Sequence, residues 1–349
     1  NDFDETLPGP WEWDVKRLAA SLEVAGRERG FTTRERTDIV LTAAAQYRTT
    51  MRDLSEMGNL DVWYQRFDVE AFLERMRTHL DKGALKEAEK NIAKAHTRDR
   101  YRDVAKLTQV VDGRRCIISD PPLIVPVDEL FPDGLHRSTM ESMAELLRDY
   151  RASLDPDRRI LLTQYSFIDM ARKVVGVGSV GTRSWVVLMR GRDDGDPLFL
   201  QAKEAQASVL EAFVADSVYP NHGQRVVEGQ RVMQASSDLL LGWETTHGLD
   251  GVARDYYVRQ LKDWKGSAHI ETMLPGAMHE YARMCGWTLS RAHARSGDRI
   301  AIGAYMGKGD RFDRAIAQFA SAYADQNERD HAALRAAADS GRITVREGL

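Results

Sequence analysis

The sequence predicts an α+β protein in which a β-rich block lies between two helical blocks. Apolar residues recur at helical spacing through the first 105 residues or so, and this periodicity returns after Pro275. Between about residues 160 and 268, short apolar runs rich in β-branched and aromatic residues alternate with glycine-containing turns. We therefore divide the chain into helical 1–159, β-rich 160–268 and helical 269–349.

Composition excludes several classes of partner. The 349 residues are long enough for two or three domains. Lysine and arginine number 49 against 53 aspartates and glutamates, so no basic field exists to hold a nucleic acid. No apolar run approaches the roughly 20 residues that span a bilayer. We expect neither a nucleic-acid partner nor a membrane.

Cysteine content indicates a reducing compartment. Cys116 and Cys285 are far apart and belong to no Cys-x-x-Cys motif, so neither a disulfide framework nor a structural zinc site is indicated. A cytoplasmic location is expected. The chain begins at Asn1 within a motif-like stretch, which indicates that it is a piece of a longer protein.

The first block is expected to contain at least four helices. Apolar residues at helical spacing fill 13–27, and Gly30 ends the run. A second helix follows the capping candidates Thr32 and Thr33 and continues to Gly58. Further amphipathic segments cover about 61–80, 84–106 and 138–153. A β-hairpin at 107–118 interrupts them, because Asp112-Gly113 suits the positive φ angles of a tight turn.

The second block reads as a series of strands that continues beyond a glycine loop. We expect a β-rich region from about residue 160, strands near 185–189, 198–203, 239–243 and 256–261, and helices near 204–215 and 223–236. Everything after Pro275 is expected to be helical apart from a glycine-rich break at 297–309.

The glycine loop is the first candidate for chemistry. Gly176, Gly178 and Gly181, with Ser179 between them, fit G-x-G-x-x-G. In a dinucleotide-binding protein this turn opens a helix, whereas here a β-type run follows. A loop between two strands matches a hairpin whose backbone amides cover phosphates. The alternatives are an ordinary turn or, if a helix follows Gly181, a dehydrogenase.

Lys203 favours the phosphate interpretation. It ends an apolar strand 22 residues after Gly181, where the third strand of a kinase carries the lysine that contacts the α- and β-phosphates. A helix should then supply a carboxylate that holds this lysine. Glu211 and Glu228 both qualify by position, and Glu228 is favoured because its helix directly precedes the next strand. The alternative is a solvated lysine at a strand end.

The chain starts with three carboxylates around one aromatic residue. Asp2, Asp4 and Glu5 surround Phe3. Magnesium prefers such oxygen donors and often takes one or two protein carboxylates together with phosphate oxygens. The alternative is an acidic, solvated terminus.

The residues that follow this start resemble a known motif. Asp2 to Thr6, then Gly9-Pro10, Trp13-Asp14-Val15 and Leu18-Ala19, look like the segment after the catalytic loop of aminoglycoside and choline kinase-like phosphotransferases. The resemblance implies that Asp2 binds magnesium. It also implies that Asp14 is a buried aspartate that braces the catalytic loop.

Over nearly its whole length the chain resembles the bacterial domain-of-unknown-function family 2252, which has been grouped with protein-kinase-like folds. The resemblance is carried by Asn1–Ser21, Lys173–Arg183, Leu200–Ala205, His222–Asp238, Tyr257–Ser267 and Cys285–Asp298. It implies a two-lobed fold in which the metal-type motif precedes the glycine loop, as in a circular permutation. It also implies a Gly-Asp-x-His-x-x-Asn catalytic segment upstream of Asn1.

Together these features predict an ATP- and Mg²⁺-dependent phosphotransferase that acts on an unidentified small molecule or protein. Gly176, Gly178, Ser179 and Gly181 would cover the phosphates, Lys203 would hold them, Glu228 or Glu211 would orient Lys203, and Asp2 and Asp4 would bind the metal. An inactive nucleotide-binding pseudokinase and a nucleotidyl transferase on the same fold are the alternatives.

Two further sets of residues, each containing basic side chains, have two possible interpretations. Arg259, Lys262 and Lys265 follow a strand and could meet phosphates or form a solvated edge. His293 and Arg295, with Asp298 beyond them, could brace a catalytic loop or simply end a helix.

Overall fold

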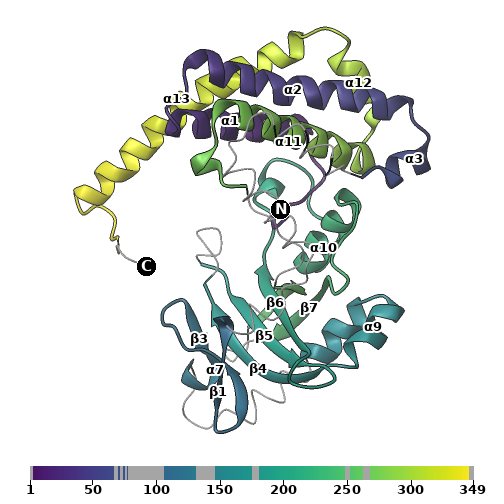
Figure 1. Cartoon of the computed structure of the whole chain (residues 1–349), viewed down its shortest axis with the longest axis vertical. Helices are drawn as coiled ribbons and strands as arrows, with labels where there is room; N and C mark the ends of the chain where they lie inside the picture. Colours follow the sequence, from purple (N-terminus) through teal and green to yellow (C-terminus); the bar gives the residue numbers. More distant parts are fainter. Residues whose placement is uncertain are drawn as a thin grey trace.

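The protein combines helices with antiparallel strands (Figure 1). The computed structural model describes residues 3–66, 106–130, 146–174, 181–247, 252–261 and 268–345, together with the single positions 70, 74 and 77. Within these ranges, none of the helices is both long and apolar enough to cross a membrane.

Helices from both ends of the chain form one packed group, in the upper half of Figure 1. Buried side chains such as Ile39, Tyr47, Met51 and Met278 form its core. Helix formation follows local signals, since Thr32 and Glu35 make a reciprocal capping box at the start of α2. The group consists of α1 (Glu12–Glu28), α2 (Thr33–Glu56), α3 (Asn59–Tyr64), α11 (Pro275–Ser296), α12 (Arg299–Met306) and α13 (Arg311–Asp339).

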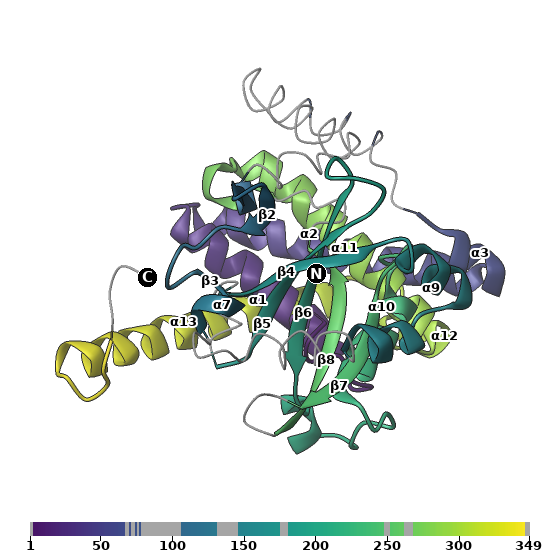
Figure 2. The same ribbon diagram turned by 90° about the horizontal axis from the view of Figure 1, so that it is seen from below.

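A six-stranded antiparallel sheet occupies the lower half of the same view. The strand order is β3-β4-β5-β6-β8-β7, and Figure 2 shows β5, β6 and β8 side by side. Its strands are β3 (Ile124–Pro126), β4 (Ser166–Lys173), β5 (Ser184–Arg190), β6 (Pro197–Ala205), β7 (Gly242–His247) and β8 (Ala253–Gln260).

The two faces of the sheet pack against different elements. Val187 and Leu200 belong to a cluster with Tyr150, from the helical residues 146–153, which lies near α9 (Pro156–Leu162). Val186 and Leu188 belong instead to a cluster with Ile117 of the hairpin β1 (Thr108–Val111) and β2 (Arg114–Ile117). Because side chains alternate along a strand, Lys203 of β6 lies on the face that also carries Phe199 and Gln201.

Helix α10 (His222–Met233) connects the two parts, since it contacts both α11 and the strands β6, β7 and β8. The contact with the sheet is close. A Cβ atom at Gly223 would lie 2.2 Å from the backbone oxygen of Tyr256 in β8, so only glycine fits there. This approach fixes α10 against the end of the sheet that carries Lys203.

Most of the expected elements are confirmed. The hairpin forms with φ angles of 49° at Asp112 and 78° at Gly113, and two strands flank the glycine loop. The segment 204–215 differs, because β6 continues to Ala205 and a capping box at Ser208 closes only the 3₁₀ turn η2 (Val209–Ala212). The break at 297–309 contains the helix α12, which Asp298 caps. Most of 61–80, nearly all of 84–106 and the first half of 138–153 lie outside the described residues.

Candidate functional site

The start of the described chain lies against β6, η2 and α10. The ring of Phe3 packs on a buried cluster that includes Ala205, Val226 and Tyr257. The amide of Thr6 donates to the carbonyl of Phe3 at 3.0 Å, which closes a tight turn. Residues 3–6 are therefore held by apolar contact and by local hydrogen bonding at one end of the sheet.

Glu5 ties this turn to the residues that follow β6. Its carboxylate oxygen Oε2 accepts from the amide of Val209 at 2.8 Å, and its carbonyl accepts from the hydroxyl of Ser208 at 3.0 Å. Glu5 thus satisfies a backbone donor at the start of η2. Its carboxylate has a structural role in this arrangement, although it belongs to the acidic start that suggested a metal site.

Arg225 of α10 fixes the path of the same segment. Its guanidinium donates to the carbonyls of Thr6 at 2.7 Å, Asp4 at 2.8 Å and Gln206 at 2.9 Å. The residue is only 2% exposed, and burial lowers the pKa of this guanidinium, while the charges of Glu5, Glu211 and Asp4 oppose that effect. Three carbonyls therefore solvate a buried cation, which joins the N-terminal turn to the end of β6.

A glycine of α10 makes room for the turn. A Cβ atom at Gly229 would lie 2.4 Å from both the methyl group and the hydroxyl of Thr6. Any other residue would push the N-terminal turn away from the helix. Gly229 therefore allows residues 3–6 to lie directly on α10.

These contacts bring an aspartate to the predicted lysine. The ammonium Nζ of Lys203 lies 2.7 Å from Oδ2 of Asp4. The lysine side chain is 13% exposed and that of Asp4 31% exposed, so the pair is partly desolvated but reachable from solvent. Two residues 199 positions apart in the sequence thus form one charged pair at the end of β6.

Further polar groups share the Lys203 face of the sheet. The amide oxygen of buried Gln201 accepts two hydrogen bonds at 3.3 Å from the guanidinium of Arg259, and its amide nitrogen lies 3.3 Å from the hydroxyl of Ser184. The ring of Tyr257 lies under both cations, 5.6 Å from Lys203 Nζ and 5.7 Å from the Arg259 guanidinium carbon. Lys262 and Lys265, which the sequence grouped with Arg259, lie outside the described residues.

The glycine loop is described only at its end. Gly176, Gly178 and Ser179 lie outside the described residues, as does Asp2. Gly181 has a φ of 91°, a conformation that favours glycine. Strands β4 and β5 on either side of the loop pair antiparallel. A strand, not a helix, follows Gly181, and this rules out the dinucleotide-binding turn that a dehydrogenase would need here.

The two glutamates expected to orient Lys203 have other partners. The carboxylate of Glu228 lies 3.0 Å from Nη1 of Arg231 on the same helix. That of Glu211 accepts from the amide of Ser208 in the capping box of η2. Neither lies within 4.0 Å of the lysine ammonium, whereas Asp4 does.

The bracing role that the resemblance implied for Asp14 needs a correction. Its side chain is 56% exposed, so Asp14 is not buried. It does meet His293, whose Nε2 lies 3.1 Å from Oδ2 of Asp14 and whose Nδ1 lies 2.8 Å from the hydroxyl of Tyr47. Tyr47 and His293 are the buried members of this chain of contacts, at 0% and 6% exposed, whereas Asp14 lies at the surface. Asp298 instead caps α12.

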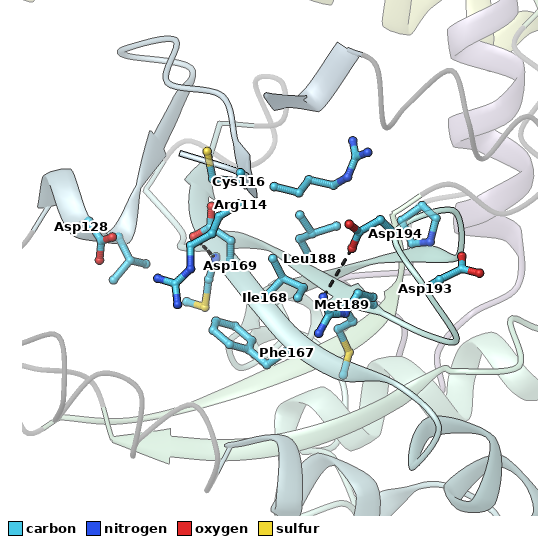
Figure 3. A pocket seen from close by; sticks show the side chains of 16 residues that line it. Arg114, Cys116, Asp128, Phe167, Ile168, Asp169, Leu188, Met189, Asp193 and Asp194 are labelled. Carbon is cyan, nitrogen blue, oxygen red and sulfur yellow. Dashed lines mark hydrogen bonds and ion pairs between the residues drawn. The ribbon is translucent and has the colours of Figure 1, made fainter. Parts of the chain in front are cut away.

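A cavity of about 580 Å³ lies elsewhere, between the hairpin β1–β2 and the far ends of β4 and β5 (Figure 3). Its walls carry charges of both signs, from Arg114, Arg115, Arg190, Asp128, Asp169, Asp193 and Asp194. Asp169 accepts from the amide of Ile117, and Arg190 pairs with Asp194. The acidic residues make this cavity a poor receptor for a triphosphate.

The donors around Lys203 suit a magnesium ion only together with phosphate oxygens. No group of three or more histidine, cysteine or acidic side chains that could hold a metal occurs within the described ranges. Magnesium does not need one, because it usually takes one or two carboxylates, water and substrate phosphates. Asp4 can supply one such carboxylate.

The sequence did not single out Arg225 or Gly229, and it included Thr6 only as the end of the acidic motif. Arginine is common in polar helices and carries no positional signal. A weak signal existed in α10, whose sequence places Gly223 and Gly229 inside a helix, where glycine is unfavourable by about 1 kcal/mol relative to alanine. Two glycines in one short helix indicate that other chain segments approach its backbone closely.

Comparison with known proteins gives one result. Neither a curated protein nor a solved structure matches the chain. A family of uncharacterized proteins conserved in bacteria, DUF2252, matches residues 1–337. This match covers almost the entire sequence, including the N-terminal turn, the glycine loop and Lys203, and so the chain belongs to the DUF2252 family.

Proposed function

We propose that this chain binds ATP and Mg²⁺ as part of a phosphotransferase with a permuted protein-kinase-like fold. The observation that carries the proposal is the 2.7 Å contact between Lys203 and Asp4, at the end of a strand that pairs with the strand after the glycine loop. In such an enzyme the lysine holds phosphates and the aspartate holds the metal ion. The acceptor would be a small molecule or a protein.

The geometry supports the proposal in two further ways. The glycine loop connects antiparallel strands β4 and β5, and Lys203 is paired with Ser184 at the start of β5. The lysine is therefore on the strand next to the loop, at the end to which the loop returns. That is where a lysine must lie if a glycine loop is to cover the phosphates that the lysine binds.

The pair also suits an exchange of partners. In the absence of nucleotide, Lys203 and Asp4 neutralise each other. A triphosphate with its magnesium ion would offer an anion to Lys203 and a cation to Asp4, so neither charge would be left unpaired. Arg225 holds Asp4 through the backbone carbonyl, so this anchor does not involve the Asp4 carboxylate.

Nucleotide binding tests the proposal directly. Ligand at 100 times its Kd stabilises a folded protein by about 2.7 kcal/mol. We expect ATP with Mg²⁺ to raise the melting temperature of the chain and Lys203→Met to weaken ATP binding by about tenfold or more, since charge-assisted hydrogen bonds contribute roughly 1.5–3 kcal/mol. Asp4→Asn should reduce the dependence on Mg²⁺.

Lys308→Met is the matched control, because Lys308 is exposed at the start of the turn before α13 and lies in the helical part. Isothermal titration of wild type and both lysine variants with ATP measures affinity separately from folding. Equal ATP affinity in wild type and Lys203→Met would overturn the proposal. So would an equal loss in Lys308→Met, because the effect would then reflect general surface charge.

A further inference from the structure

A second cationic group lies where α11, α3 and the end of α10 meet. It consists of Arg66, Arg291 and Arg295, which we call the arginine triad. Arg291 and Arg295 are one helical turn apart on α11, and Arg66 follows α3. The triad lies at the C-terminal end of α10, next to Met233. Arg225, which holds Asp4, lies eight residues earlier on the same helix, a distance of about 12 Å along its axis.

Arg291 is the buried member of the triad. It is 4% exposed, and its guanidinium donates to the carbonyls of Gln65 at 2.6 Å and Met233 at 3.4 Å. Its remaining nitrogen, Nη2, is buried and has no hydrogen-bond partner. Burial, followed by the neighbouring charges of Arg295 and Arg66, lowers the pKa of Arg291. Two carbonyls therefore leave part of this cation unsatisfied.

Arg295 also lacks hydrogen-bond partners for part of its guanidinium. One of its terminal nitrogens donates to the carbonyl of Gln234, whereas its Nε is buried without a partner. The indole of Trp63 lies 3.9 Å from its guanidinium carbon and covers one face of the group. The stacking limits the guanidinium to donors along its edge, which is the arrangement that binds oxyanions in a forked geometry.

No carboxylate within the described part of the chain pairs with any of the three arginines. Carbonyl groups at the end of α10 give partial compensation, since a helix C-terminus carries negative partial charge. A buried arginine beside two others nevertheless remains costly without a counter-charge. Arg66 and Trp63 are exposed and Arg295 is half-buried, so the edge of the triad can be reached from solvent, whereas Arg291 lies beneath it.

We propose that the arginine triad binds a phosphate group, either free phosphate or a small phosphate monoester. A tetrahedral dianion matches three guanidinium groups in charge, and it could accept from the two orphaned nitrogens, Arg291 Nη2 and Arg295 Nε, once the side chains shift enough to expose these buried atoms. This site is separate from Lys203 and does not depend on the proposed nucleotide site. Because its donors also hold the end of α10, a bound phosphate would strengthen the contact between the helical part and the sheet.

Isothermal titration with inorganic phosphate, against sodium chloride of equal ionic strength, tests the site. We expect binding to the wild type, an affinity about fivefold weaker in Arg66→Gln and one at least tenfold weaker in Arg295→Gln. Arg66 is exposed and makes no hydrogen bond to the described residues, so its variant keeps the test available if Arg295→Gln fails to fold. Methyl phosphate in a parallel titration distinguishes a monoester ligand, which it would mimic, from free phosphate.

Two controls separate this site from other effects. Arg34→Gln removes an exposed arginine of α2 whose nearest carboxylate lies 4.0 Å away, and Lys203→Gln removes the cation of the candidate nucleotide site. Both should bind phosphate as the wild type does. The proposal is overturned if phosphate does not bind above the chloride control, if Arg34→Gln weakens binding as much as Arg66→Gln, or if Lys203→Gln abolishes binding.

Discussion

The contact between Gly229 and Thr6 allows a sharp test of how the N-terminal turn is held. In Gly229→Ala the new Cβ would lie 2.4 Å from Cγ2 and Oγ1 of Thr6 and 2.9 Å from its Cβ. Carbon atoms normally approach to about 3.5–4.0 Å, so the overlap exceeds 1 Å. The threonine side chain is short and branched at Cβ, and it cannot swing clear unless the turn itself moves.

The expected change in the free energy of unfolding of Gly229→Ala is the balance of two opposing effects. Overpacking of this kind destabilises by about 1–3 kcal/mol, whereas alanine improves on glycine in a helix by about 1 kcal/mol. We expect a net loss of up to about 2 kcal/mol in the free energy of unfolding, measured by urea denaturation. Hydrogen exchange should also accelerate at the amides of Thr6 and Val209, because both depend on the position of the turn.

Gly303→Ala is the matched control. Gly303 lies inside α12, and the nearest atom to its added Cβ would be 3.5 Å away, an ordinary contact. This variant should be neutral or more stable than wild type by up to about 1 kcal/mol. Adding Thr6→Ala to Gly229→Ala removes both 2.4 Å clashes and should restore at least 0.5 kcal/mol, a typical coupling for residues in contact. A Gly229→Ala protein as stable as Gly303→Ala would refute the proposed packing.

Three other substitutions probe buried charges. Glu244 is 3% exposed, and its carboxyl group has no hydrogen-bond partner. Burial, with the charge of Asp149, raises the pKa of this carboxyl well above 4.5. The folded protein therefore binds the carboxyl proton more tightly than the unfolded chain does, so the free energy of unfolding falls as pH rises above about 4.5. Glu244→Met should therefore gain about 1–3 kcal/mol at pH 8 and less at pH 4 in urea melts, and an equal gain at both values would contradict the assignment. The carboxylate of Asp313 accepts from Nε and Nη2 of buried Arg48 at 2.9 and 2.8 Å. Asp313→Asn removes this bidentate partner and should lower the free energy of unfolding by about 3–5 kcal/mol. A loss below about 1 kcal/mol on thermal unfolding would contradict this role of the ion pair. Arg225→Lys cannot reach three carbonyls at once and should lose about 2 kcal/mol, with faster exchange at the N-terminal turn than the wild type; unchanged exchange would show that other contacts hold the turn.

Local signals in the sequence predicted most of the local structure. The Asp112-Gly113 hairpin and the Thr32 cap form as expected, because each depends on residues that are neighbours in the chain. The two strands around the glycine loop also form, because β-branched and aromatic runs flank it. The helix expected at 204–215 does not form beyond one 3₁₀ turn, since pairing with β8 extends β6 to Ala205.

The site was less predictable because its contacts join distant segments. The sequence singled out Lys203 and Asp4 for separate reasons, but proposed a glutamate as the partner of the lysine. Asp4 takes that place because Arg225, 221 residues away, anchors its carbonyl. No periodicity or motif records such a contact. The arginine triad was equally hidden, since its members come from two segments more than 200 residues apart.

Arg225 makes its hydrogen bonds to the N-terminal turn through main-chain carbonyl oxygens. Every amino acid presents that group, so these hydrogen bonds do not depend on which side chain stands at position 4, although the negative charge of Asp4 also favours the Arg225 cation. Asp4→Asn would therefore neutralise the side chain opposite Lys203 while leaving the hydrogen bonds to the backbone beneath it possible. Such a substitution changes the chemistry at position 4 and leaves the backbone there in the same place.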